Sequence, residues 1–182
     1  LGGGPLDGRE FKAVFSGVAN RVMTPDQFDL PLEFGTLRQN GVGLGSGGFM
    51  VYDDSRWMVD MAWMFSHFLA KSSCGQCVPC NSGTRTITEH LVNIREQRGT
   101  QDDIDAILAE AGRCTSQSLL CLPIQGSCLV PSCIHKFTDE SQPGHNVNQY
   151  DREVIIPKIQ DFDDATQTFT FEARPKEFIP AV

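Results

Sequence analysis

Three cysteines stand close together in the stretch SSCGQCVPCNSGT, residues 72–84: Cys74, Cys77 and Cys80. Two residues separate each cysteine from the next, and this spacing lets three thiolates wrap one corner of an iron–sulfur cubane, each binding a different iron. Zinc sites more often use paired C-x₂-C knuckles that lie apart in the sequence. A cubane and a tetrahedral metal both take four protein ligands, so a fourth ligand must come from elsewhere in the chain.

The fourth ligand has four candidates, Cys114, Cys121, Cys128 and Cys133. We expect Cys121, in SLLCLPI, to lie in a loop between helices, from which it reaches across a bundle end to a cluster held by another loop. We expect Cys114 at a helix end, and Cys128 and Cys133 in the last helical segment. In such places a cysteine is more often a small buried hydrophobe. The loop position favours Cys121, and on this reasoning the other three stay open.

The composition is that of a globular protein. Of the 182 residues, 40% are hydrophobic and 21% are charged, and the formal charge is −8 without a run of lysine or arginine. Such an acidic chain is a poor match for nucleic acid or an anionic membrane. No stretch approaches the roughly 20 apolar residues that span a bilayer. We therefore expect no nucleic-acid partner and no direct membrane insertion.

The seven cysteines are an odd number, and the first three are too close together for a disulfide framework. Clustered cysteines in a chain without a visible secretion signal indicate metal ligation in a reducing compartment, so we expect a cytoplasmic protein. The chain opens on Leu1 rather than on methionine, and we expect the native start to be missing.

The patterning predicts an α+β chain in three segments, residues 1–55, 56–140 and 141–182. The first is a small β-rich unit and the last an irregular C-terminal extension. Turn residues and short apolar runs place the expected strands at residues 9–18, 49–52 and 166–173.

The middle segment is helical. Apolar residues at helical spacing predict four helices joined by short loops into a small bundle, at residues 57–71, 84–97, 100–113 and within 127–140. Thr100 is the expected N-cap of the third helix, and Pro131 is expected near the first turn of the fourth. The second helix, expected to start near Gly83, would point its N-terminal amides towards the clustered cysteines. That placement favours a negatively charged, thiolate-ligated cluster.

The pattern S-C-G-Q-C-V-P-C-x₂-G-T, followed 41 positions after the third cysteine by S-L-L-C-L, resembles the family of NADH-binding flavoprotein subunits of respiratory complex I. NAD-reducing hydrogenases and NAD-dependent formate dehydrogenases have related subunits. The stretch from Phe11 to Asp54 is similar to the β-grasp domain that precedes the cluster domain in this family. The resemblance covers roughly residues 9–140 and implies a small β-grasp-like domain followed by a four-helix bundle that carries an iron–sulfur cluster.

The resemblance also implies a ligand set and a function. Cys74, Cys77, Cys80 and Cys121 would hold one [4Fe–4S] cluster, which takes electrons from FMN that NADH has reduced and passes them to an adjacent iron–sulfur subunit. The family's NADH- and FMN-binding domain is absent from this sequence, so both molecules are expected only on an absent domain or a partner chain. Flavin-binding and other iron–sulfur subunits are the expected partners. The location would be cytoplasmic, peripheral to a membrane complex, or the mitochondrial matrix in a eukaryote.

One residue beside the motif departs from the family pattern. The family usually places an arginine directly after the third cysteine, and this chain has Asn81. The loss of a cation beside the cluster should lower its reduction potential, unless Arg85 compensates. Two other hypotheses use the same four cysteines or their remnants: a structural zinc-binding interaction module, and a scaffold protein that has lost its cluster.

Several further features are weaker candidates. GLGSGG at residues 43–48 satisfies G-x-G-x-x-G, but a strand rather than a helix is expected after it, so a Gly-rich turn is favoured over a dinucleotide site. His67 is expected to be a buried histidine, and His90 and His145 surface residues. A second metal site at His135 is not favoured. Asp102, Asp103 and Asp105 are expected to be acids at the start of a helix.

Overall fold

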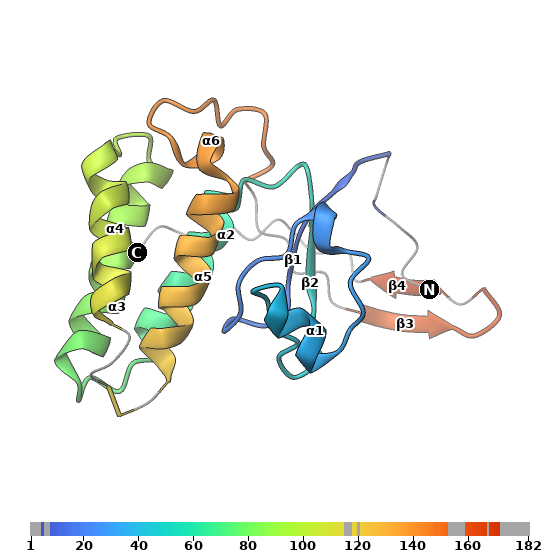
Figure 1. The fold of residues 1–182 in the computed structure, drawn as a ribbon. Coiled ribbons are helices and arrows are strands. Elements are labelled where there is room, and N and C mark those ends of the chain that lie inside the picture. Colours follow the sequence, from blue (N-terminus) through green and yellow to red (C-terminus); the bar gives the residue numbers. More distant parts are fainter. Residues whose placement is uncertain are drawn as a thin grey trace. The chain divides into compact units, whose positions relative to one another are not determined.

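The computed structural model describes residues 5, 8–114, 118–119, 121–152, 159–166 and 168–171. Internal contacts divide the chain into two units, Leu1–Tyr150 and Asp151–Val182. The described residues form helices and two small antiparallel sheets (Figure 1). The predicted α+β class is therefore confirmed.

The first sheet pairs β1 (Phe11–Phe15) with β2 (Met50–Asp53) in antiparallel register, and Val14 lies opposite Val51. Both strands lie within one residue of the expected ranges. Ala13 and Phe15 of β1 are fully buried, and they belong to the main hydrophobic core. Between the strands the chain forms a 3-10 turn, η1 (Pro25–Gln27), and the short helix α1 (Phe34–Gln39). A separate small core lies beneath these two elements and contains Met23, Leu37 and Val42.

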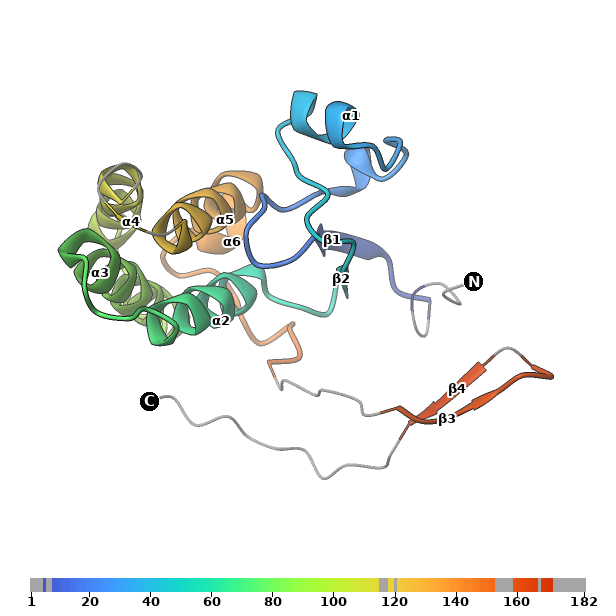
Figure 2. The same cartoon turned by 90° about the horizontal axis from the view of Figure 1, so that it is seen from below.

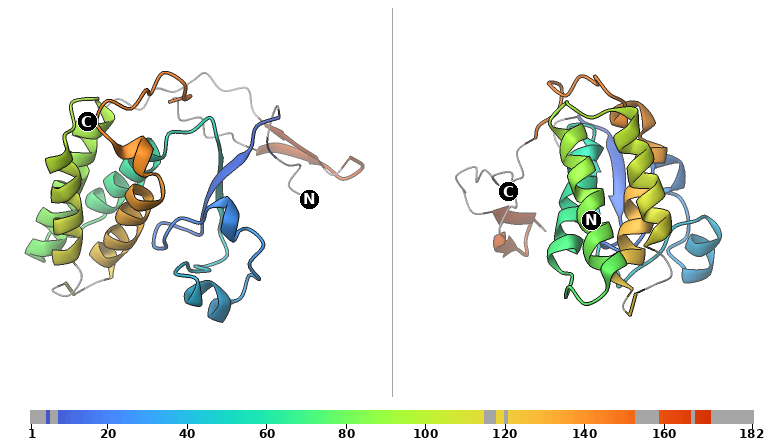
Figure 3. Two further views of the ribbon diagram at one scale, coloured as in Figure 1. Left: turned by 45° about the horizontal axis from the view of Figure 1, so that its top comes forward. Right: turned by 90° about the vertical axis from the view of Figure 1, so that its left-hand side faces the viewer.

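The larger helices are α2 (Met58–Lys71), α3 (Val78–Arg95), α4 (Gln101–Arg113) and α5 (Leu122–Lys136). Helices α2 and α4 each contact both α3 and α5, so the four helices surround a common core (Figure 2). Neighbouring helices run side by side (Figure 3). Consecutive helices are connected at alternating ends. The connections α2–α3 and α4–α5 lie at one end of the helices, and the connection α3–α4 lies at the other (Figure 1). A short helix, α6 (Thr138–Ser141), follows α5 at the other end.

Two helices start at other residues than the sequence predicts, and in both cases this changes the position of a cysteine relative to the helix. Helix α3 begins at Val78 rather than near Gly83, with Cys77 as its N-cap and Cys80 in its first turn. Helix α5 begins at Leu122, with Cys121 as its N-cap, so Pro131 lies inside the helix rather than near its first turn. Each helix has a proline at its second position, where the missing N–H has no intrahelical partner to lose.

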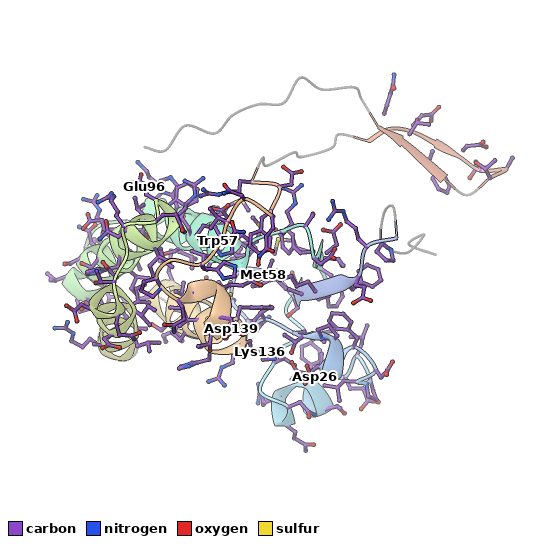
Figure 4. All side chains as sticks on the ribbon, turned by 90° about the horizontal axis from the view of Figure 1, so that it is seen from above. Asp26, Trp57, Met58, Glu96, Lys136 and Asp139 are labelled. Atoms are coloured by element: carbon purple, nitrogen blue, oxygen red, sulfur yellow. The ribbon has the colours of Figure 1, made fainter. Side chains whose placement is uncertain are left out.

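Glu140 ties the β-rich part to the helices. Its carboxylate accepts a hydrogen bond from the Met58 N–H at 2.9 Å and forms an ion pair with Lys12 at 2.5 Å. Its carbonyl oxygen accepts a hydrogen bond from the Trp57 indole at 3.1 Å. On the other side of the junction, the Lys136 ammonium donates to Thr24 at 3.2 Å, close to Asp26 (Figure 4). Glu140 in α6 therefore links the start of α2 to Lys12 of β1.

The second unit contains one hairpin, in which β3 (Ile159–Asp163) pairs with β4 (Thr168–Phe171). The Asp163 carboxylate accepts hydrogen bonds from the Ala165 N–H at 2.9 Å and the Thr166 hydroxyl at 2.8 Å, which stabilises the turn. β4 confirms the strand expected within residues 166–173. The apolar run at residues 153–158 lies outside the described residues.

Candidate metal centre

A cavity of about 250 Å³ opens at the end of the helices where α2 meets α3 and α4 meets α5. Its lining residues are Ser73, Cys74, Gln76, Cys77, Cys80, Ser118, Leu119 and Leu122. Three predicted ligands therefore face one space. The fourth, Cys121, lies between two lining residues, Leu119 and Leu122, at the start of α5.

Two polar groups approach the sulfurs around this cavity. The Leu119 N–H donates a hydrogen bond to the Cys77 sulfur at 3.5 Å, which joins the α4–α5 connection to the cysteine loop. The Ser73 hydroxyl lies 3.4 Å from the Cys80 sulfur and accepts a hydrogen bond from the Gly75 N–H at 3.3 Å. Gly75 has a φ of 81°, a conformation that glycine adopts without strain. The loop between Ser73 and Cys80 is thus folded back on itself by its own residues.

The N-terminus of α3 provides a positive electrostatic potential beside the cysteines. The helix is 18 residues long and begins directly after Cys77. Its free N-terminal amides carry a partial positive charge, which favours anionic groups beside the first turn. The helix N-terminus thus lies at Cys77, five residues earlier than expected, with Cys80 in its first turn.

The other three cysteines lie in different surroundings. Cys114 is buried at the end of α4, and its thiol donates a hydrogen bond to the Pro79 carbonyl at 3.4 Å. Burial and the nearby charge of Glu110 raise the pKa of Cys114. Cys133 is fully enclosed, and burial raises its pKa to about 12. Cys128 is half-buried on α5. A thiol with a raised pKa is a poor source of the thiolate that a metal needs, so burial makes Cys114 and Cys133 poor candidate ligands.

The arrangement fits a cluster better than a single metal ion. Four sulfurs at about 2.3 Å from one zinc stand within roughly 4 Å of each other. Thiolates of a cubane bind separate irons and therefore stand further apart, around a space that the inorganic core fills. Across the part of the chain that the structure describes, no three His, Cys, Asp or Glu side chains converge as ligands of one ion. Three cysteines that line one cavity match the donor chemistry of an iron–sulfur cluster.

The Gly-rich loop is a structural turn, as expected. A side chain at Gly45 would bring its Cβ within 2.6 Å of the Ser16 carbonyl oxygen, and Gly45 has a φ of 62°. The Ser16 hydroxyl donates to the Gly43 carbonyl, and β2 rather than a helix follows. Close approach of two backbones therefore explains the glycine at position 45.

Sequence reasoning missed the contacts of two histidines. His90 does not lie free on the surface, because its Nδ1 is 2.8 Å from the Asp103 carboxylate. His67 is half-buried and stacks on Trp63 at a centroid distance of 5.3 Å. His67 does not line the cysteine cavity. The contact of His90 with Asp103 joins two helices and has no local sequence signal, whereas Trp63 and His67 are four residues apart on α2, a spacing that places them on one helix face.

Comparisons with known proteins agree with the geometry. Residues 60–143 match the family described as the NADH-ubiquinone oxidoreductase-F iron-sulfur binding region. The HndC component of the NADP-reducing hydrogenase of Solidesulfovibrio fructosivorans is 33% identical over 108 residues, which cover 59% of this chain and 22% of that protein. The F 2 component of the NADH-quinone oxidoreductase of Rhizobium meliloti (strain 1021) is 35% identical over 106 residues, which cover 58% of this chain and 25% of that protein.

A solved structure has the same fold. An NAD+-reducing [NiFe]-hydrogenase in its H2-reduced state superposes with a TM-score of 0.66 and 26% sequence identity, over 81% of this chain and 24% of that chain. The chain spans about a quarter of the length of the proteins that it matches.

The fold and the site define a helical module in which three closely spaced cysteines line one cavity at an end of the helices. Residues 60–143 match the iron–sulfur binding region of NADH-ubiquinone oxidoreductase-F, and the relatives and the solved structure support the resemblance to the flavoprotein subunits of respiratory complex I and NAD-reducing hydrogenases. The cofactor of that region is a [4Fe–4S] cluster, which confirms the cofactor predicted from the cysteine spacing.

Proposed function

We propose that this chain is the electron-transfer module of a multi-subunit NAD-linked oxidoreductase and that it holds one [4Fe–4S] cluster through Cys74, Cys77, Cys80 and Cys121. The observation that carries the proposal is the cavity lined by three of these cysteines and by the neighbours of the fourth. When bound, such a cluster accepts and releases one electron at a time.

The chain's own residues hold the ligands and set their electrostatics. The tight loop from Ser73 to Cys80 holds three sulfurs in place, and the Leu119 N–H places a donor on the Cys77 sulfur. Leu119 and Leu122 line the cavity with apolar atoms, and Cys80 is buried, whereas Cys74 and Cys121 are exposed to solvent. Donors to a thiolate sulfur and a helix N-terminus both favour the more negative state, so they raise the reduction potential.

The wider assignments form part of the same proposal. Residues 1–55 would be a β-grasp-like domain, residues 56–140 the cluster-binding four-helix bundle, and residues 141–182 an extension. FMN and NADH would bind to another domain or a partner chain, and further iron–sulfur subunits would receive the electrons. A cytoplasmic location, peripheral to a membrane complex, fits this role. None of the helices in the described ranges has the length and apolar content needed to cross a bilayer.

Reconstitution under anaerobic conditions tests the proposal. The chain, supplied with iron and sulfide, should turn brown, should be bleached by a chemical reductant, and should recover its colour on oxidation. The reduced protein should give the electron paramagnetic resonance signal of a reduced [4Fe–4S] cluster. A colourless protein that retains one zinc ion and accepts no electron would instead establish the structural zinc module.

A further inference from the structure

Two buried side-chain atoms have no hydrogen-bond partner within the part of the chain that the structure describes. They are the indole nitrogen of Trp63 and the hydroxyl oxygen of Ser118. A buried donor without a partner is destabilising, so folded proteins contain few of them. Each such atom therefore needs an explanation, and a group that binds beside it is one explanation.

The two atoms lie in different places. Trp63 belongs to the helical core, where it is 6% exposed and its ring centroid lies 4.1 Å from the Arg95 guanidinium carbon. Trp63 does not line the cysteine cavity, whereas Ser118 lines it together with Cys74, Cys77 and Cys80. The Ser118 hydroxyl is thus the atom that a cluster in this cavity would have as a neighbour.

The residues around the cavity offer the Ser118 hydroxyl little besides sulfur. Leu119 and Leu122 are apolar, and Gln76 is exposed to solvent. The Ser73 hydroxyl already contacts a cysteine sulfur and a backbone N–H. Thiolates and the inorganic sulfides of a cluster carry no hydrogen, so a serine hydroxyl beside them can only donate.

The residue after Ser118 already places a donor on a sulfur of the site. The Leu119 N–H donates a hydrogen bond to the Cys77 sulfur at 3.5 Å. Ser118 and Leu119 lie in the connection between α4 and α5, which leads to the proposed ligand Cys121 at the start of α5. One short segment therefore carries a proposed ligand and two hydrogen-bond donors beside the same cavity.

We propose that the Ser118 hydroxyl donates a hydrogen bond to a sulfur atom of the bound [4Fe–4S] cluster and thereby raises its reduction potential. The inference rests on the proposed function and assigns to that site a residue that tunes it without binding iron. One added electron makes the sulfur atoms more negative. A hydrogen-bond donor therefore stabilises the reduced cluster more than the oxidised one.

A redox titration of the reconstituted chain, followed by electron paramagnetic resonance, tests this donor. Ser118→Ala should keep its iron and sulfide, but its equilibrium constant for one-electron reduction should fall by about tenfold, which lowers the midpoint potential by about 59 mV. Ser118→Thr retains the hydroxyl and should have a potential close to that of wild type. The matched control is Ser127→Ala on α5. The Ser127 hydroxyl donates to the Pro123 carbonyl at 2.8 Å and does not line the cavity, so the potential should not change.

Electron–nuclear double resonance of the reduced cluster gives a second readout. A hydrogen that is bonded to a cluster sulfur and exchanges with D₂O couples to the unpaired electron spin. Spectra of wild type in H₂O and in D₂O should therefore differ by such couplings. A coupling should be missing in Ser118→Ala and present in Ser118→Thr and Ser127→Ala. A serine with a purely structural role would not produce this difference.

The outcomes separate this inference from the proposed function. A fully loaded Ser118→Ala chain with the wild-type potential and all of the exchangeable couplings would overturn the inference alone, because the hydroxyl would then bond only to water. Loss of iron in Ser118→Ala but not in Ser127→Ala would make Ser118 a ligand rather than a donor, and would also overturn it. A wild-type chain that takes up no cluster overturns the proposed function, and this inference with it.

Discussion

Asp103 is the residue whose carboxylate makes the most described contacts in the helical unit. It accepts hydrogen bonds from Asn93 at 2.8 Å and from the Thr100 N–H at 2.8 Å and hydroxyl at 3.0 Å, and it lies 2.8 Å from His90. Burial opposes its ionisation, but these hydrogen bonds outweigh burial and hold the pKa of Asp103 well below its usual range. The carboxylate closes the capping box at the start of α4 and links α4 to α3.

Asp103→Ala should therefore destabilise the protein by about 1–2 kcal/mol at neutral pH. Because folding depresses this pKa, the stabilisation is present above the unfolded-state pKa near 3.8 and is lost as pH falls below it. The difference between wild type and variant should therefore shrink between pH 7 and pH 3, measured by urea unfolding. Asp105→Ala is the control, because Asp105 is exposed and bonds only to the Gln101 side chain among the described contacts. Equal losses in both variants would contradict this account.

The sequence predicted the candidate ligands better than their surroundings. Cysteine spacing is a local property, so Cys74, Cys77 and Cys80 could be singled out directly, while the expected loop position favoured Cys121 and the family pattern supported it. The contact of Leu119 with Cys77 spans 42 positions, and that of His90 with Asp103 depends on two helices meeting in one register. Such contacts become visible only when the helices are packed.

Helices α3 and α4 pack closely at Gly83. A Cβ at this position would overlap the Cys114 sulfur and would lie 3.1 Å from the Glu110 carboxylate. The missing side chain lets the two helices approach, and Cys114 fills the space. This fit gives Cys114 a packing role that is separate from cluster ligation.

Gly83→Ala should destabilise the protein by about 1–3 kcal/mol through overpacking, although alanine favours helix more than glycine does. In a Cys114→Ala background the same change should cost much less, because the colliding sulfur is gone. Gly112→Ala is the control, since a Cβ there meets no atom within 4 Å and should stabilise by up to about 1 kcal/mol. Urea unfolding of the four variants in a double-mutant cycle measures the coupling. A Gly83→Ala cost that is the same in both backgrounds would refute the packing argument.

The positions of the helices were predictable because their apolar periodicity is long, but two starts were not. The sequences CVPCN and CLPIQ contain proline, which usually marks a loop, and here the proline occupies the second helical position. The sequence alone does not distinguish a proline in the first turn of a helix from a proline that ends a helix. Tertiary packing of the first turns against the cysteine cavity decides between them.

At the scale of the whole molecule, long-range contacts determine how the elements pack together, which sequence periodicity does not predict. Glu140 reaches Met58 across 82 positions and ties α2 to α6. No local pattern predicts such a contact, whereas the α+β class follows from composition and periodicity alone.

The central claim is that four particular cysteines hold one cluster, and the iron and acid-labile sulfide content of the reconstituted chain tests it most directly. Wild type should bind about four irons and about four sulfides per chain. Cys121→Ser should lose most of both, whereas Cys128→Ser, seven residues along the same helix, should match wild type. A Cys121→Ser chain that keeps its full iron and sulfide, or a wild-type chain with zinc and no sulfide, would contradict the account.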